Sequence, residues 1–287
     1  MANYVQPVRY EYLTRNTYYQ NPSITSVNTN YVPFFNNDAS IAFNYCRKLV
    51  NVSGLNDDIT TMYGTFWYCN SLKNIDKLPN SLVNLSMTFQ YCNRMTDCPT
   101  IPNSVTNMYS TFNQCTNLVN APSIPDNVIN LSNTFNYCID LNNVPYIGNS
   151  VNRMDYTFYW CNKLQTIPNI PSNVESMYYT FYGCSNLTGN IYIYSNKISS
   201  AYQCFGGALR KDVYFPYTYA NCEISKSYDT FTAYYDENGT KNNVYLHDLN
   251  SISSTDWSYQ VNSETNNATL IKYTGSNTSV SIPQYIE

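Results

Sequence analysis

The stretch MYSTFNQCTNL, Met108 to Leu118, decides the fold because its phenylalanine, cysteine and leucine recur at a fixed step of 23 residues. The phenylalanines of the series are Phe43, Phe66, Phe89, Phe112, Phe135, Phe158 and Phe181. Cysteines follow three residues later, at Cys46, Cys69, Cys92, Cys115, Cys138, Cys161 and Cys184. A leucine or methionine follows each cysteine by three residues, and a threonine precedes six of the phenylalanines. Self-similarity at a fixed period is the signature of a repeat protein.

A second block keeps the same step and consists of an aliphatic residue followed by proline. Its members are Leu78-Pro79, Ile101-Pro102, Ile124-Pro125 and Ile170-Pro171, with Ile147-Gly148 as a variant. One unit of this length cannot bury its apolar side chains alone, so stacked units must share a core, as in a solenoid. The spacing of Phe, Cys and Leu predicts a short helical or 3₁₀ turn with one face inward, and the proline pair predicts a short extended segment ending at a bend. Asparagines in phase are predicted to bond backbone groups at the bends, at Asn84, Asn107 and Asn130.

The repeat, written TFxxCxxL…IPxSVxN, resembles the BspA-type leucine-rich repeat of bacterial and phage surface proteins. The resemblance covers about residues 40 to 190. The chain departs from the family pattern where Thr-Phe replaces the common Ala-Phe. The resemblance implies a leucine-rich-repeat solenoid and an adhesive or recognition role, with partners that vary across the family.

Three regions are expected along the chain. Residues 1–39 read as an N-terminal extended arm, serving either as a cap or as an anchor on a larger assembly. Residues 40–190 hold the leucine-rich-repeat solenoid of seven 23-residue units. Residues 191–287 read as degenerate repeats near Cys204 and Cys222 followed by a β-rich C-terminal cap, with a hairpin turn at Asn238-Gly239.

The repeat cysteines pose a choice among a catalytic thiol, a metal ligand, half of a disulfide and a small buried side chain. Their spacing fits no zinc motif, in which ligands occur in close pairs. The single histidine, His247, lies far from the repeats in sequence, so a catalytic thiol has no nearby base. Disulfides between adjacent coils satisfy the distance requirement, but an odd number of cysteines cannot pair completely. We expect free thiols that each fill a narrow slot in the core.

Binding is expected at the outward positions between the buried residues. Aromatic and amide side chains recur there, and this mixture suits a glycan or a protein surface. The alternative is that the rings stack along the solenoid and only stabilise it. The candidate binding residues are Tyr63, Trp67, Tyr68, Tyr91, Tyr109, Tyr137, Tyr159, Trp160, Tyr178 and Tyr182, of which the last four form the densest group.

Composition narrows the classes of function. Charged residues make up 12% of the chain and the net charge is −4, so neither nucleic acid nor an anionic membrane is indicated as a partner. No apolar run is long enough to span a bilayer. One histidine and no acid–base, phosphate-binding or metal motif predict a protein that is not an enzyme and holds no cofactor.

The expected setting follows from the N-terminal sequence. The start MANYVQPVRYEYLTRN has no apolar h-region, which predicts that the protein is made and assembled in a cytoplasm. The preferred hypothesis is a bacteriophage virion component, in a tail, fibre or head decoration, that binds a host surface glycan or protein and contacts other virion proteins through its N-terminal arm. The alternatives are a bacterial cell-surface adhesin of the BspA type and a purely structural virion part. A fibre component would be trimeric, and a lone solenoid monomeric.

Overall fold

The structure is a computed structural model of the chain. It describes residues 12–14, 17–188, 191–195 and 197–207, and the backbone of the strands that follow residue 210. The chain divides into two compact units, Met1–His247 and Asp248–Glu287. The predictions for residues 1–11, for Cys222 and for the Asn238-Gly239 turn fall outside the described residues.

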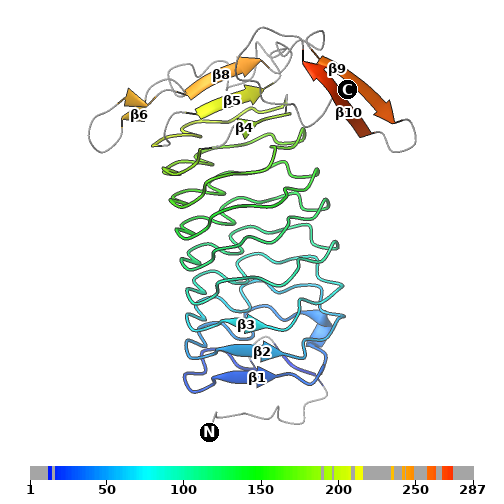
Figure 1. Cartoon of the computed structure of the whole chain (residues 1–287). Coiled ribbons are helices and arrows are strands. Elements are labelled where there is room, and N and C mark those ends of the chain that lie inside the picture. The colour runs from blue at the N-terminus through cyan, green and yellow to red at the C-terminus, as the bar shows by residue number, and fades with distance from the viewer. Residues whose placement is uncertain are drawn as a thin grey trace. The chain divides into compact units, whose positions relative to one another are not determined.

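Regular secondary structure is sparse among the described residues up to 207 (Figure 1). The strands up to residue 248 are β1 (Ser26–Asn28), β2 (Asn51–Ser53), β3 (Asn74–Ile75), β4 (Ile191–Tyr192), β5 (Lys211–Phe215), β6 (Tyr234–Tyr235), β7 (Lys241–Asn242) and β8 (Val244–Asp248). The order β1-β2-β3 forms one parallel sheet, the order β4-β5-β8 a second sheet, and β6 pairs with β7 antiparallel. In the second unit β9 (Trp257–Asn262) pairs antiparallel with β10 (Asn267–Tyr273). Among the described residues the one helical element is the 3₁₀ helix η1 (Phe35–Asn37).

The described residues from 17 to 207 form a stack of parallel coils, one coil per repeat, which we call the coil stack (Figure 1). Isolated parallel bridges join residues in the same position of successive coils. The bridges run from Asp38 through Thr61, Asn84, Asn107, Asn130, Arg153 and Ser176 to Ser200. Each repeat therefore advances the chain by one coil, and the side chains of equal position lie above one another.

Backbone amides in each coil alternate between two kinds of acceptor. The amide of Gly64 donates to Ser86 O of the next coil at 3.0 Å, and that of Phe66 donates to Thr88 O at 2.9 Å. The amide of Cys69 instead donates to Phe66 O of its own coil, at 2.9 Å. Polar backbone groups are thereby paired without long strands or helices, which the buried location requires.

The prediction of a helical or 3₁₀ turn over Phe, Cys and Leu is wrong. Left-handed residues flank each phenylalanine at two positions before and two positions after it, as at Gly64, with φ +58°, and Tyr68, with φ +61°. A right-handed helix cannot pass through residues in that region. Consecutive β-turns take its place, since the amides of Cys69 and Leu72 donate to Phe66 O and Cys69 O, three residues earlier in each case. The three side chains still face inward, because these turns repeat every three residues.

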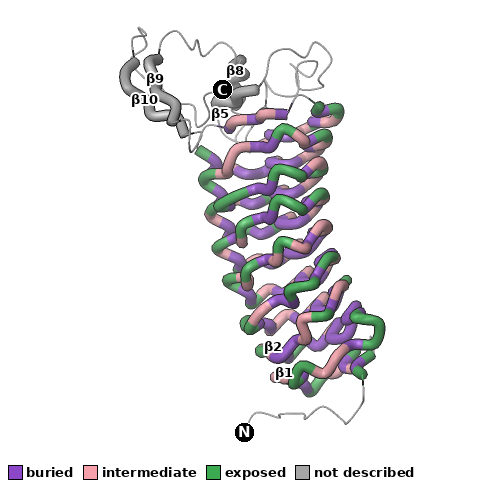
Figure 2. The backbone as a smooth tube through the Cα atoms, turned by 90° about the vertical axis from the view of Figure 1, so that its right-hand side faces the viewer, coloured by how far each residue is buried: buried purple, intermediate pink, exposed green. Residues whose placement is uncertain are grey.

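The core is a set of aligned rows of side chains along the coil stack. Figure 2 shows that buried residues occur in every coil of the stack and alternate with exposed ones. Phenylalanine rings stack from Phe43 to Phe181, with centroids 5.2–5.7 Å apart and planes within 4–16° of parallel. The structure buries all of the ladder residues named from the sequence, Phe66, Cys69, Phe89, Cys92, Phe112, Cys115, Phe135, Cys138, Phe158, Cys161, Phe181 and Cys184. Identical side chains pack against one another from coil to coil, so the repeat supplies one continuous core.

Polar residues of the repeat satisfy backbone groups at the bends. The predicted role of the in-phase asparagines is confirmed, because Asn84 Oδ1 and Asn107 Oδ1 accept the amides of Ser86 and Tyr109, each at 3.0 Å. The threonine before each phenylalanine reaches back one coil, as where Thr111 Oγ1 donates to Leu85 O at 3.0 Å. A hydroxyl at that position therefore ties adjacent coils together.

The coil stack extends beyond the seven units at both ends. On the N-terminal side β1 pairs with β2, and the ring of Tyr18 stacks on Phe43 at 4.9 Å. On the C-terminal side Phe205 stacks on Phe181 at 5.4 Å. Residues 17–39 thus contribute a coil that covers the first phenylalanine of the repeats.

Candidate recognition surface

The cysteines of the repeat are free, buried thiols that donate hydrogen bonds. Cys115 Sγ donates to Phe89 O at 3.0 Å and Cys138 Sγ donates to Phe112 O at 3.1 Å, and the same contact recurs along the row. Burial raises the pKa of the Cys115 thiol to about 12. A nucleophile or metal ligand needs the thiolate, which this environment disfavours. Each cysteine therefore fills a core slot and links two coils.

We predict that thiol reagents discriminate Cys98 from the ladder cysteines. Cys98 is out of phase with the repeat and half-buried, whereas the other eight described cysteines are buried. Burial raises the pKa of the Cys98 thiol as well, so access of the reagent is what distinguishes the two kinds of site. At pH 8, iodoacetamide should alkylate Cys98 first and reach the ladder only after unfolding, as read by peptide mass spectrometry of each site. Because the folded pKa of the Cys115 thiol lies above its ordinary value of 9.0, the ladder stabilises the fold fully below pH 9 and loses this contribution as the pH rises toward 12.

Simultaneous alkylation of the ladder cysteines and Cys98 in the folded protein would contradict this prediction. A Cys98→Ser variant supplies the control, since its ladder should then stay unmodified over the same time.

The candidate binding residues separate into three groups. Tyr63 and Tyr109 have no ring contact among the described residues, and Tyr63 is 41% exposed. Trp67, Tyr68 and Tyr91 belong to a second group, which together with Tyr45 we call the N-terminal row. Tyr68 stacks on Tyr91 at 4.3 Å and 5°. Face-to-face stacking covers the ring faces, so the N-terminal row behaves as the stabilising stack that the sequence left as an alternative.

The third group is an aromatic cluster at the C-terminal end of the repeats. It consists of Tyr137, Tyr156, Tyr159, Trp160, Tyr178, Tyr179, Tyr182 and Tyr202. Several of its pairs meet edge to face, as Tyr178 does with Tyr179 at 4.7 Å and 68°. Tyr137 and Trp160 are parallel within 7° but 6.4 Å apart, so their faces do not cover each other fully. The aromatic cluster thus offers both ring faces and phenol groups to a partner.

The backbone of the aromatic cluster is left-handed at the same positions as in the other coils. Tyr156 and Tyr179 have φ +55° and Trp160 has φ +59°. Such a conformation costs about 1–2 kcal/mol for a residue with a side chain. The bonds to the next coil offset this cost, because the amides of Tyr156 and Trp160 donate to Tyr178 O and Tyr182 O at 2.8 and 2.7 Å.

Sequence reasoning missed Tyr156, Tyr179 and Tyr202. The first two lie two residues before a phenylalanine, a position that is Gly64, Met87, Ser110 and Asn133 in earlier coils and therefore shows no aromatic period. Burial raises the pKa of Tyr156 and Tyr179 above the ordinary value. Both phenols are thus neutral hydrogen-bond donors at neutral pH.

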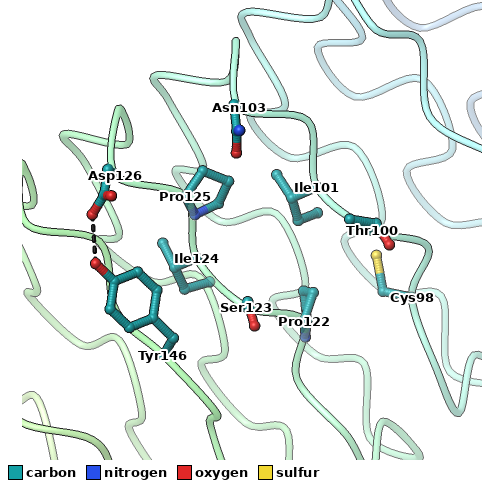
Figure 3. A pocket seen from close by; sticks show the side chains of 10 residues that line it. All are labelled: Cys98, Thr100, Ile101, Asn103, Pro122, Ser123, Ile124, Pro125, Asp126 and Tyr146. Atoms are coloured by element: carbon teal, nitrogen blue, oxygen red, sulfur yellow. Dashed lines mark hydrogen bonds between the residues drawn. The ribbon is translucent and has the colours of Figure 1, made fainter. Parts of the chain in front are cut away.

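One pocket lies on the side of the coil stack that carries the aliphatic–proline block of each repeat (Figure 3). It has a volume of about 330 Å³ and draws its lining from three consecutive coils. The lining residues are Cys98, Thr100, Ile101, Asn103, Pro122, Ser123, Ile124, Pro125, Asp126 and Tyr146. Tyr146 Oη donates to Asp126 Oδ1 at 2.5 Å, and this bond holds the pKa of the Asp126 carboxyl below its ordinary value.

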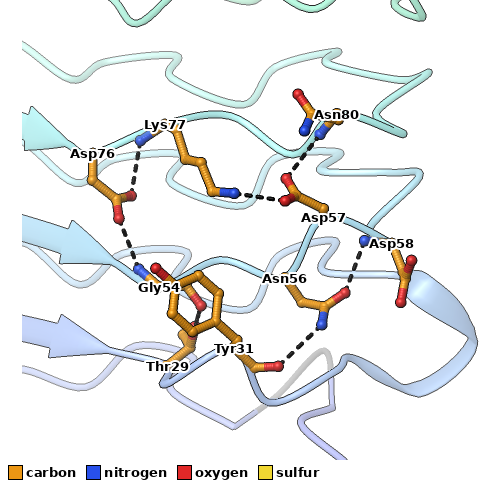
Figure 4. A network of polar contacts seen from close by, with 9 residues as sticks. All are labelled: Thr29, Tyr31, Gly54, Asn56, Asp57, Asp58, Asp76, Lys77 and Asn80. Atoms are coloured by element: carbon orange, nitrogen blue, oxygen red, sulfur yellow. Dashed lines mark hydrogen bonds and ion pairs between the residues drawn. The ribbon is translucent and has the colours of Figure 1, made fainter.

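A polar network ties the coils of β1, β2 and β3 together (Figure 4). Lys77 Nζ lies 2.6 Å from Asp57 Oδ2 and 5.8 Å from the centre of the Tyr31 ring. The hydrogen bond from Lys77 holds the pKa of Asp57 below its ordinary value. Asp76 Oδ2 accepts the amide of Gly54 at 3.0 Å. Since each of these groups has a partner from another coil, we assign the network a structural role.

Two further kinds of site were sought in the part of the chain that the structure describes. No group of three or more His, Cys, Asp or Glu side chains there could hold a metal ion. No helix within these residues is both long enough and apolar enough to cross a membrane.

The coil stack, with its leucine ladder and outward aromatic residues, defines a leucine-rich-repeat protein. The family of the BspA type leucine rich repeat region matches residues 11–142 and 108–230, in six copies. The chain therefore belongs to the BspA-type leucine-rich-repeat family, and the prediction of that repeat type is confirmed.

Two solved structures are similar to the chain. A leucine rich repeat protein of T. pallidum is 20% identical, with a TM-score of 0.35, and the match covers 67% of this chain and 68% of that one. A leucine-rich repeat protein from Bacteroides ovatus is 14% identical, with a TM-score of 0.30, over 85% of this chain and 91% of that one. No curated protein matches the chain.

Proposed function

We propose that the protein is a non-catalytic recognition protein that attaches to a glycan or protein partner through the aromatic cluster. The observation that carries this proposal is the gathering of eight Tyr and Trp rings on adjoining coils, with Trp160 38% and Tyr202 47% exposed. Rings of this kind dominate the energetics of binding surfaces because they bury large areas at low conformational cost.

The rigidity of the backbone that carries the aromatic cluster supports the same proposal. The rings stand on backbone that is bonded to both neighbouring coils, so little ordering is needed when a partner binds. The charged groups beside the cluster are already engaged, because Arg153 lies 3.7 Å from Asp155 and Lys163 lies 2.7 Å from Asp140. A neutral or weakly charged partner surface therefore suits the cluster best.

The family fits a bacterial cell surface, which makes a surface adhesin the favoured setting of this proposal. The virion setting expected from the sequence stays a prediction, as do a structural virion role and a docking role for the N-terminal arm. Immunogold labelling of intact cells and of purified particles distinguishes these settings.

The predicted consequence of removing the centre of the aromatic cluster is a loss of binding. On a glycan and whole-cell array, the double variant Trp160→Ala/Tyr182→Ala should bind at least about 30-fold more weakly than the unaltered chain, since the loss of even one such ring costs about 2 kcal/mol. The matched control is Trp67→Ala/Tyr91→Ala in the N-terminal row, which should keep its affinity. Equal losses in the two double variants, with both folded by circular dichroism, would refute the aromatic cluster as the site.

A further inference from the structure

A second row of prolines interrupts the bonding between coils on the side of the pocket. Pro99, Pro122, Pro145 and Pro168 are in phase, two residues before the aliphatic–proline or Ile147-Gly148 block. In the preceding coil the same position is Asp76, whose amide donates to Val52 O at 3.3 Å. Proline has no amide hydrogen, so this bond between coils is lost from Pro99 onward.

A backbone amide and a backbone carbonyl have no hydrogen-bond partner where the pocket opens, and among the described residues the amides of Leu78 and Ile147, at the same position of other coils, have none either. The amide of Ile124 donates to Tyr146 O at 3.0 Å, but the equivalent bond from Ile101 to Ser123 is absent. Among the described residues neither the Ile101 amide nor the Ser123 carbonyl has a hydrogen-bond partner, although Ile101 is only 3% exposed. A buried amide without a partner is rare in proteins, so water or a ligand is required there.

The coils on the other side of the pocket are pressed together. A Cβ added to Gly148 would lie 2.0 Å from Pro125 O, which explains why glycine replaces proline in this unit alone. The pocket itself lies where the coils of Ile101 and Ser123 adjoin, with Tyr146 of the next coil in its lining. Figure 3 shows these two residues on adjoining coils, with Asp126 and Tyr146 at one side of the pocket.

We propose that this pocket binds the acetamido group of an N-acetylated sugar. The acetamido carbonyl accepts the Ile101 amide, its N–H donates to Ser123 O, and its methyl group lies against Ile124. The sugar hydroxyls then reach Asn103 and the Asp126 carboxylate. No cationic side chain lines the pocket, so a neutral sugar is favoured over an anionic one.

A peptide is the less suitable occupant. An added strand needs donors and acceptors over several residues, and Pro99 and Pro122 supply no donor. One donor and one acceptor match a single amide group. This site is separate from the aromatic cluster, so it goes beyond the proposed function and does not depend on it.

The test compares three sugars on the full chain by NMR titration. N-acetylglucosamine should bind about tenfold more tightly than glucose, because it adds two hydrogen bonds. Its acetamido methyl should receive the strongest saturation transfer. In protein labelled with 15N-isoleucine, the Ile101 amide, assigned with an Ile101→Val variant, should shift on titration.

Variants separate the pocket from other sites. Ser123→Trp, at an exposed lining residue, should abolish binding, whereas Val83→Trp, at a residue 42% exposed and outside the pocket lining, should not. Trp160→Ala/Tyr182→Ala should leave this binding unchanged, so failure of one proposal does not entail failure of the other. Four results would overturn the inference: equal affinity for glucose, tighter binding of glucosamine, tighter binding of N-acetylalanine methylamide, or an unmoved Ile101 amide.

Discussion

Replacing Phe112 by alanine is expected to lower the free energy of unfolding by about 3–5 kcal/mol. The ring is fully buried and lies between Phe89 at 5.4 Å and Phe135 at 5.5 Å. The cavity left behind cannot collapse, because each flanking ring is also held by the next ring in the stack. We expect the loss to fall in the upper part of this range, as measured by urea unfolding followed by circular dichroism.

Tyr63→Ala is the control for Phe112→Ala. Tyr63 is 41% exposed and has no ring contact among the described residues, so its removal should change stability by about 0.5 kcal/mol or less. Similar small losses in both variants would mean that the phenylalanine row is not what holds the coils together.

Gly148→Ala is expected to cost about 1–3 kcal/mol even though it adds a single methyl group. The added Cβ would lie 2.0 Å from Pro125 O and 2.8 Å from Asp126 Cα. Both are backbone atoms, so relief requires movement of a whole coil and not of one side chain. Thermal unfolding measures the effect as a lowered Tm.

Ser150→Ala provides the comparison for Gly148→Ala two residues away. Its side chain is exposed and makes no hydrogen bond that the structure describes, so its Tm should match that of the unaltered chain. An unchanged Tm for Gly148→Ala would contradict the close packing of the coil of Gly148 against the coil of Pro125.

The sequence predicted the core well because burial depends on residue identity at a fixed period. Phe66, Cys69 and Leu72 are each fully buried, as their recurrence indicated. The roles of Asn84 and Asn107 could be predicted equally well, since an asparagine side chain at a bend commonly accepts a hydrogen bond from a backbone amide. Such features need only the period and the chemistry of single residues.

Backbone conformation could not be predicted in the same way. The spacing of Phe, Cys and Leu suits a helix, yet Gly64 and Tyr68 have a left-handed backbone. This conformation lets successive amides donate in turn to the next coil and to their own coil. Tyrosine is a poor sequence signal for a positive φ, and only Gly64 and Gly183 hint at it.

The candidate site was predicted in part. Trp160 and Tyr182 were named as its densest region, whereas Tyr156 and Tyr179 were missed because no earlier coil carries an aromatic residue at their position. Ring orientation separates the N-terminal row from the aromatic cluster, and orientation depends on the neighbours in adjacent coils. The pocket likewise depends on which backbone groups stay without a partner, such as the Ile101 amide, and that is not visible in the sequence.

The left-handed residue two positions after each phenylalanine has a consequence for how this protein can diverge. Tyr68, Gln114, Trp160 and Gly183 all occupy that position with φ between 59° and 76°. Their backbone bonds are the same whatever the side chain, so a substitution there alters the exterior without altering the interior. The surface chemistry can therefore vary while the core stays the same, and two relatives of equal length that share one core can display unrelated exteriors.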